Sequence, residues 1–157
     1  MAVNTSTGFE SLILGPLAFE AIFRAASIEI RSGPQPETAD MPASGTLLAR
    51  ITADGGVWQA GSADNGLRFV RNARYVYKDP AQRWVLRGLA AGAAGWFRLL
   101  GNAPDGGGLS FDTPRIDGAI GLDDDSLGDF QMRLPTLALT ADTSIEFGEW
   151  WLATPPL

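Results

Sequence analysis

The stretch RWVLRGLAAGAAGWFRLLGN, residues 83–102, decides the fold class of this chain. It contains two apolar runs, residues 84–86 and 96–100, which are joined by small residues. Strand side chains alternate between two faces. In the second run, one face takes Phe97 and Leu99, and the other takes Trp96, Arg98 and Leu100. Runs this apolar predict two β-strands at the centre of a sheet, with residues 88–95 as the connection.

The rest of the composition agrees with a β-rich fold. The 157 residues are enough for one domain, 1–157, with a substantial core. The 19 glycines and 10 prolines predict many turns, and about eight to ten short strand-like segments lie between them. We therefore predict an all-β fold, an antiparallel β-sandwich or jelly roll, with one short N-terminal helix.

The composition also excludes several classes of function. The chain has no cysteine, so disulfides, thiolate metal sites and cysteine nucleophiles are excluded. It has no histidine, which excludes a Ser-His-Asp triad and histidine-ligated metals. A net charge of −6 argues against binding to nucleic acid or to an anionic membrane. We expect no cofactor.

Two features are predicted near the N-terminus. Residues 1–8 are small and polar and predict an arm that is mobile or becomes ordered on a partner. A glycine–proline pair then precedes apolar residues at helical spacing, and Glu20 and Arg24 form a favourable i, i+4 pair. Residues 16–24 are therefore the predicted helix, which would plug one end of the β-structure or dock on a neighbouring subunit. The region resembles neither a secretory signal nor a membrane span.

Two further segments carry structural predictions. Residues 32–45, SGPQPETADMPASG, form a long surface loop, which is either a solvated crossover between two sheets or a binding loop. Residues 143–152, TSIEFGEWWL, alternate in polarity and predict one continuous C-terminal strand.

Two motifs could carry ion chemistry. The run Asp123, Asp124, Asp125 offers oxygen ligands for calcium, but a calcium loop spaces its carboxylates at alternate residues. Contiguous aspartates favour a solvated turn instead. Three glycines at 106–108 lack the following helix and the lysine or hydroxyl of a phosphate loop, so a turn is favoured there too.

An enzyme without histidine or cysteine would have to work with carboxylates, lysine, tyrosine or arginine, and a small glycoside hydrolase needs only two carboxylates at the right distance. Glu146 and Glu149 fall on opposite faces of the predicted strand, and nothing selects Glu29 or Glu37 as a partner for either. Spacing therefore identifies no catalytic pair, and we predict that the protein is not an enzyme.

The aromatic residues leave a binding function open. Tryptophan and tyrosine side chains on a β-sandwich can stack on sugars, and those among polar neighbours are Trp58, Tyr75, Tyr77 and Trp150. A carbohydrate-binding module is therefore an alternative. The simpler interpretation is that these rings fill the core and subunit contacts, where aromatic residues are enriched.

The order of motifs resembles a family of small tailed-bacteriophage proteins found among structural genes. In that family a strand leads to a Gly-x-Gln-Pro loop, a Gly-Thr-Leu-Leu strand, a Gly-Trp-Phe-Arg core strand and an Arg-Ile-Asp-Gly segment. The corresponding segments here are SGPQPETAD (32–40), SGTLLARI (44–51), GLAAGAAGWFRLLG (88–101) and PRIDGAIG (114–121). These motifs are structural and span most of the chain.

The resemblance implies a virion component with a β-sandwich fold, assembled in the bacterial host cytoplasm. Such a protein would decorate or cement the capsid, or serve the head–tail region, through contacts with itself and with other virion proteins. We expect these contacts on the N-terminal arm, the proline-rich loop and the C-terminal strand. The positions chosen are Phe9, Leu12, Pro34, Pro36 and Trp150.

Overall fold

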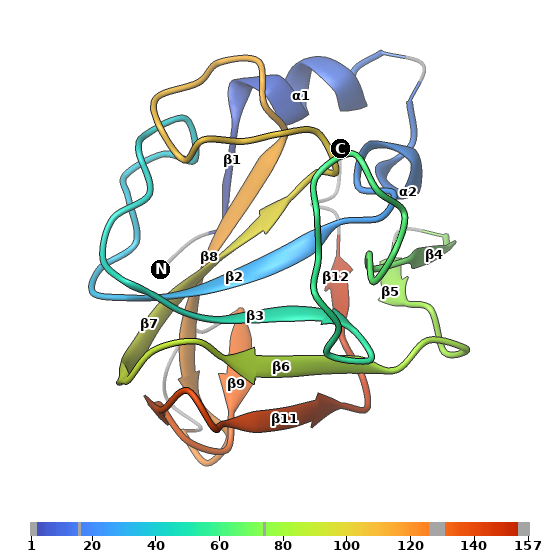
Figure 1. Ribbon diagram of the computed structural model, residues 1–157. Coiled ribbons are helices and arrows are strands. Elements are labelled where there is room, and N and C mark those ends of the chain that lie inside the picture. Colours follow the sequence, from blue (N-terminus) through green and yellow to red (C-terminus); the bar gives the residue numbers. More distant parts are fainter. Residues whose placement is uncertain (1–2, 16, 74, 126–130, 154–157) are drawn as a thin grey trace.

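The computed structural model describes residues 3–15, 17–73, 75–125 and 131–153, and most of its regular structure is β-sheet (Figure 1). A large sheet has nine strands and a small sheet has three. The large sheet contains β1 (Asn4–Thr5), β2 (Ser27–Ser32), β3 (Leu47–Ala53), β6 (Trp84–Gly88), β7 (Gly92–Leu100), β8 (Arg115–Leu122), β9 (Met132–Leu134), β10 (Ala138–Leu139) and β11 (Ser144–Phe147). The small sheet contains β4 (Phe69–Asn72), β5 (Tyr75–Lys78) and β12 (Trp151–Ala153).

The large sheet is organised around β7, as the sequence predicted. Its main order is β1-β8-β7-β2-β3-β6-β11, so β6 and β7 both lie in the interior. The two strands do not pair with each other, because β2 and β3 lie between them. Strand β10 returns to β7, and a short turn joins it to β11, which pairs with β6. Residues 138–147 therefore bridge two strands that stand apart in the sheet.

The connection between β6 and β7 is shorter than predicted. Strand β6 ends at Gly88 and β7 begins at Gly92, so residues 92–95 of the predicted connection belong to β7 and only residues 89–91 connect the two strands. These residues pass close to β3, where Leu89 and Ala90 donate backbone hydrogen bonds to the carbonyl of Leu48. A Cβ at Gly92 would lie 2.6 Å from Leu48 Cδ2, so a larger residue there would require the Leu48 side chain to shift.

The helix prediction was confirmed in part, since a shorter helix lies within the predicted range and a second helix precedes it. Helix α1 spans Thr7–Ile13, and α2 spans only Phe19–Ile22, within the predicted 16–24. Helix α1 begins where the Ser6 side chain accepts a hydrogen bond from the Phe9 backbone N–H. This N-cap satisfies a free donor of the first turn and fixes the helix start.

The N-terminal segment is also not a free arm from Asn4 onward. Asn4 and Thr5 form β1 and pair with Asp117 and Ile116 of β8. Ser6 is buried, and its hydroxyl donates to the carbonyl of Thr113 at 2.8 Å. Residues 4–8 are thus part of the domain.

The predicted C-terminal strand is divided between the two sheets. Strand β11 lies at the edge of the large sheet, and β12 pairs with β5 in the small sheet. Between them, the Trp150 carbonyl accepts a hydrogen bond from the backbone of Lys78. Residues 148–150 separate the two strands. The alternation of polar and apolar residues over 143–152 therefore spans two strands in different sheets, and the prediction of one continuous strand was wrong.

An aromatic cluster joins the helices to both sheets. Phe69 of the small sheet lies 5.3 Å from Phe19 of α2 and 5.2 Å from Trp84 of the large sheet, measured between ring centroids. Trp150 contacts both Phe69 and Trp84. Large aromatic side chains contribute much of the buried area of a core, so this cluster fixes the small sheet against the rest.

Candidate functional site

The proline-rich loop, residues 33–46, connects β2 to β3. These strands are neighbours in the large sheet, so the loop is not a crossover between sheets. It folds back closely over β7, since a Cβ at Gly95 would lie 2.1 Å from the Gly33 carbonyl oxygen. Gly33 and Gly45 also have φ values of 79° and 71°, which only glycine adopts easily. Glycines therefore allow the loop to lie against the sheet.

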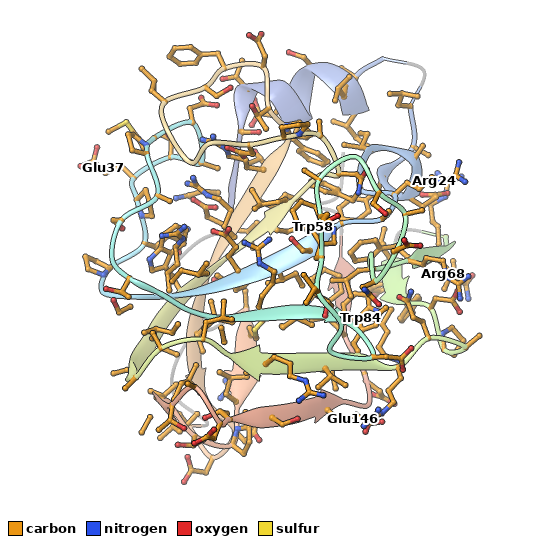
Figure 2. All side chains as sticks on the ribbon, in the orientation of Figure 1. Arg24, Glu37, Trp58, Arg68, Trp84 and Glu146 are labelled. Carbon is orange, nitrogen blue, oxygen red and sulfur yellow. The ribbon has the colours of Figure 1, made fainter. Side chains whose placement is uncertain are left out.

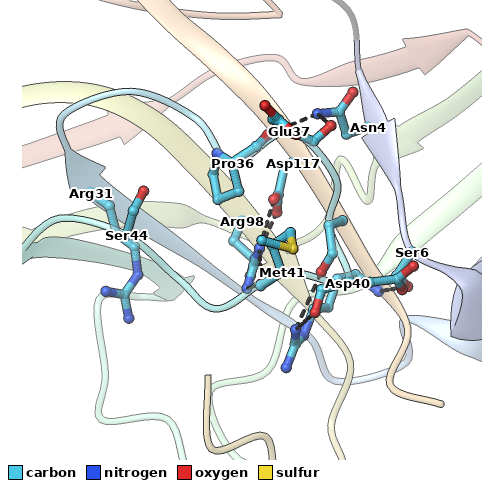
Figure 3. Close-up of polar contacts among 12 residues, drawn as sticks. Asn4, Ser6, Arg31, Pro36, Glu37, Asp40, Met41, Ser44, Arg98 and Asp117 are labelled. Carbon is cyan, nitrogen blue, oxygen red and sulfur yellow. Dashed lines mark hydrogen bonds and ion pairs between the residues drawn. The ribbon is translucent and has the colours of Figure 1, made fainter. Parts of the chain in front are cut away.

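A buried ion pair holds the middle of this loop. Arg98 of β7 donates from Nε and Nη2 to the two carboxylate oxygens of Asp117 on β8, each at 2.7 Å. The side chains are 1% and 0% exposed. Nη1 and Nη2 of Arg98 also donate to the Met41 carbonyl at 3.2 Å, so the pair joins the sheet to the loop (Figure 3). A bidentate contact between an arginine and a carboxylate fixes the relative orientation of the two side chains and is stronger than a single neutral hydrogen bond.

A second buried pair anchors two loops at once. Arg115, at the start of β8, donates from Nε and Nη2 to Asp105 at 2.7 and 2.6 Å. Asp105 belongs to the glycine-rich loop, residues 101–114. Nη1 of Arg115 donates to the Ala39 carbonyl at 3.2 Å, which lies in the proline-rich loop. One guanidinium therefore fixes both loops over the same strand.

The pKa values of the two aspartates are shifted in opposite directions. Burial raises the pKa of Asp117 above its usual range, although the hydrogen bonds and charge of Arg98 oppose this effect. Burial also acts to raise the pKa of Asp105. There the hydrogen bonds from Arg115 and from the Gly107 backbone outweigh burial, and the pKa is lowered.

The N-terminal segment holds the outer side of the proline-rich loop. The Asn4 amide donates to the carbonyls of Pro36 and Glu37 at 3.0 and 2.9 Å (Figure 3). The backbone and hydroxyl of Thr7 both donate to the Asp40 carboxylate. The loop is thus fixed from the sheet below and from the N-terminus beside it.

The two loops meet and form one surface, which we call the loop face. Ala43 donates a backbone hydrogen bond to Gly107, and Ser110 donates one to Asp40. The apolar side chains exposed on these loops are Met41, Leu109 and Phe111, at 44%, 60% and 58% exposure. The loop face therefore presents apolar groups on a rigidly supported backbone.

A polar groove lies beside the glycine-rich loop. Two hollows of about 300 and 190 Å³ share Glu29, Leu100, Asp105 and Gly106 in their walls. Glu29 is paired there with Arg31 and Arg50, each through a contact of 2.8 Å. Each of these charged groups already has a partner, which is typical of a network that supports the loops.

The four candidate sugar-binding rings lie in different environments. Trp58 donates from Nε1 to the Ala25 carbonyl at 2.9 Å, and the Arg50 guanidinium lies 5.2 Å from its ring centroid. Trp150 is buried in the aromatic cluster. Tyr75 and Tyr77 lie side by side on β5, with ring centroids 6.1 Å apart. Only this tyrosine pair combines adjacent rings with exposure to solvent.

A larger hollow of about 480 Å³ adjoins the tyrosine pair, and we call it the small-sheet hollow. Its wall contains Val70, Asn72, Tyr77, Lys78, Pro80, Gly148, Glu149 and Trp150. Lys78 is only 9% exposed. Its Nζ donates to the Asp79 carbonyl at 3.4 Å, and among the described residues no carboxylate forms an ion pair with it.

The structure separates the five predicted contact residues. Phe9 packs against Phe19 and Phe23, Leu12 packs against the core, and Trp150 is buried. Pro34 is exposed and Pro36 is half-buried, both on the proline-rich loop. Of the five, only the two prolines lie close to the loop face.

The other motifs occupy turns or separate surfaces. Asp123 and Asp124 are exposed where the chain leaves β8. Glycines 106–108 lie in the loop paired with residue 43. Glu146 forms an exposed ion pair with Arg83, whereas Glu149 lines the small-sheet hollow (Figure 2). In the described ranges, no cluster of three acidic side chains could hold a metal ion.

Sequence reasoning missed the groups that organise the loops. Arg98 stands within Trp-Phe-Arg-Leu-Leu, and Asp117 stands within Arg-Ile-Asp-Gly-Ala-Ile. A charge inside an otherwise apolar strand is a signal of a buried pair, because burial without a partner is costly. Lys78 could have been noticed as the only lysine in the chain.

The comparisons with known proteins add no relative. No protein-family model matches the chain, and no curated protein or solved structure is detectably similar to it. Across the part of the chain that is described, no helix has the length and apolar character needed to cross a membrane.

Proposed function

We propose that this protein is a non-catalytic structural component of a tailed-phage virion, acting as a homo-oligomer through its loop face. The observation that carries this proposal is the pair of buried ion pairs, Arg98–Asp117 and Arg115–Asp105, whose guanidiniums hold loop carbonyls. Buried ion pairs contribute little net stability compared with apolar packing. Their value here is the fixed shape of two loops that expose apolar side chains.

Fixed loops on a rigid sheet are a common basis for recognition. A preformed surface avoids the entropy cost of ordering loops when a partner binds. Met41, Leu109 and Phe111 supply the apolar centre that subunit interfaces require, with the prolines of the loop nearby. The resemblance of the strand and loop motifs to tailed-phage structural proteins supplies the setting, a capsid decoration or head–tail role assembled in the host cytoplasm.

We further propose that the scaffold is a β-sandwich. Its support is the packing of the small sheet on the large one through Phe69 and Trp84. Sheets that pack face to face bury their apolar sides in this manner.

Two measurements test the proposal. Mass spectrometry of purified phage particles, with cryo-electron microscopy to place the chain, should find the protein in the virion. Its absence from particles would refute the virion role.

The loop face is tested separately by self-association, measured by analytical ultracentrifugation. Phe111→Asp should weaken the oligomer at least tenfold, because it places a charge in an apolar contact. Val57→Asp is the matched control, since Val57 is also an exposed apolar residue and lies outside the loop face. Equal effects of the two variants would rule out the loop face as the subunit contact.

A second candidate function is carbohydrate binding. Tyr75 and Tyr77 favour it, because they form adjacent rings beside the small-sheet hollow.

A further inference from the structure

The small-sheet hollow contains Lys78, a mostly buried lysine for which the described residues supply no carboxylate partner. Lys78 is nine-tenths buried, and its Nζ makes one long hydrogen bond to a neighbouring carbonyl. A buried ammonium normally requires a carboxylate and several hydrogen bonds to offset its lost hydration. Arg98 and Arg115 satisfy this rule elsewhere in the molecule, with ion pairs of 2.7 and 2.6 Å. Lys78 therefore differs from Arg98 and Arg115, which each have a carboxylate partner.

We propose that the small-sheet hollow binds a saccharide that carries a carboxylate, with Lys78 as the partner of the carboxylate. This inference deepens the second candidate function and does not depend on the virion role. The hollow of about 480 Å³ lies within the range of small-molecule sites.

The backbone around Lys78 is fixed before any ligand arrives. Its N–H donates to Trp150 at 2.8 Å, and the next N–H, of Asp79, donates to Arg68 at 3.0 Å. Phe69 lies directly opposite Lys78 on β4. A preorganised cation needs no rearrangement on binding, which favours affinity.

Aromatic and polar groups share the wall of the hollow. Tyr77 lines it, and the ring of Tyr75 is 6.1 Å away from that of Tyr77. Aromatic faces suit the apolar face of a sugar ring. Asn72 and Glu149 line the same hollow and are exposed, so an amide and a carboxylate are available for hydroxyl groups. This combination matches a polyhydroxylated ring with one anionic group.

The charges select a monoanion. Lys78 is the one cation in the wall, and Glu149 lies in the same wall. A phosphate or a polyanionic chain would meet repulsion from Glu149 and from the net charge of −6 on the whole chain. A neutral sugar would leave Lys78 without a counter-ion. A single carboxylate on a sugar satisfies both conditions.

Lys78 is the only lysine, so it can be observed selectively. Reductive ¹³C-methylation keeps the charge of the amine and gives one side-chain NMR signal. Glucuronate and N-acetylneuraminate are the probes, and glucose and inorganic phosphate are the comparisons. At least one acidic sugar should shift the signal saturably, while glucose should shift it at least tenfold more weakly. No saturable shift with either acidic sugar, or an equal shift with phosphate alone, would overturn the proposal.

Variants separate the two parts of the site. Lys78→Met should lower affinity for the acidic sugar at least tenfold, and Tyr77→Ala should lower affinity for acidic and neutral sugars alike, measured by calorimetry on the unmodified chain. Arg24→Met is the matched control, because it removes the same charge from an exposed position outside the hollow (Figure 2). Unchanged binding by Lys78→Met would refute the carboxylate partner. Loss of sugar binding would leave the virion test unaffected, so the two proposals fail independently.

Discussion

The buried cations beneath the loop face and the lysine in the small-sheet hollow differ in their partners. Beneath the loop face, Arg98 and Arg115 are 1% exposed and each meets an aspartate at two atoms. In the hollow, Lys78 is 9% exposed, and the hydrogen bond that it makes to the described part of the chain is to the Asp79 carbonyl at 3.4 Å. Paired cations inside a fold specify shape, whereas an unpaired one leaves a charge for something else to satisfy. The comparison therefore separates scaffold from candidate binding chemistry.

The largest effect is expected when one of the buried arginine–aspartate pairs is broken by Arg98→Met. We expect it to lower the free energy of unfolding by about 3–5 kcal/mol, because Asp117 would remain buried without its partner. Urea denaturation monitored by tryptophan fluorescence measures this change.

A double variant serves as its control. Arg98→Met with Asp117→Leu removes both charges and should be more stable than Arg98→Met alone, because no unpaired charge is left. If the single variant unfolds within about 1 kcal/mol of the natural protein, the pair does not hold the loops in the manner described.

A smaller effect is expected where the proline-rich loop touches the sheet. Gly95→Ala would place a Cβ 2.1 Å from the Gly33 carbonyl oxygen, so the loop must move away. We expect a loss of about 1–3 kcal/mol, with faster amide hydrogen exchange in residues 33–46.

Gly106→Ala is the matched control, because nothing lies within 4 Å of a Cβ there. It should change stability by no more than about 0.5 kcal/mol. Equal effects at the two positions would show that the loop is not closely packed on β7.

The sequence predicted the central strands well because alternation and apolarity are local signals. The runs at 84–86 and 96–100 became parts of β6 and β7. The sequence did not predict where the first helix begins, because a side-chain contact sets this position. Ser6 caps α1, and its hydroxyl donates to the carbonyl of Thr113, more than a hundred residues away in the chain. Long-range contacts of this kind leave little trace in a local pattern.

The same limit applies to the candidate sites. The proline-rich loop was identified as a surface loop, but its four anchoring carbonyl contacts to Arg98 and Arg115 come from distant strands. The polar neighbours of Trp150 in the sequence left a sugar-binding or partner-contact role open beside a core position, and the structure places its ring in the aromatic cluster. Residue environment depends on the sheet to which each segment belongs, and that assignment is a tertiary property.

The two aspartates beneath the loop face allow a pH test. The pKa of Asp105 is lowered in the folded state, so the unfolded chain binds more protons near its ordinary pKa of about 3.9. The stability that Asp105 contributes is therefore present above pH 4 or so and is lost as pH falls through the lower, folded pKa. Asp105→Asn should flatten the fall in unfolding free energy with pH in this range.

Asp117 provides the contrast. Burial raises its pKa, so its own contribution has the opposite sign, and Asp117→Asn should not flatten the acid loss. Denaturation curves collected from pH 3 to 6 or so measure both slopes. A flatter slope in Asp117→Asn than in Asp105→Asn would contradict the assignment.

The smallest effect on stability is expected for Lys78→Met, and this variant tests most directly whether Lys78 differs from the paired arginines. Lys78→Met removes an ammonium group that has no carboxylate partner within residues 3–15, 17–73, 75–125 and 131–153, and the methionine keeps most of the apolar stem. We expect the free energy of unfolding to stay the same or to rise by about 1 kcal/mol, measured under the same conditions as for Arg98→Met. A large loss, comparable with that of Arg98→Met, would mean that Lys78 supports the fold and would contradict its role as the partner of a ligand carboxylate. Stability retained together with lost binding of acidic sugars would show that the charge is kept for the ligand.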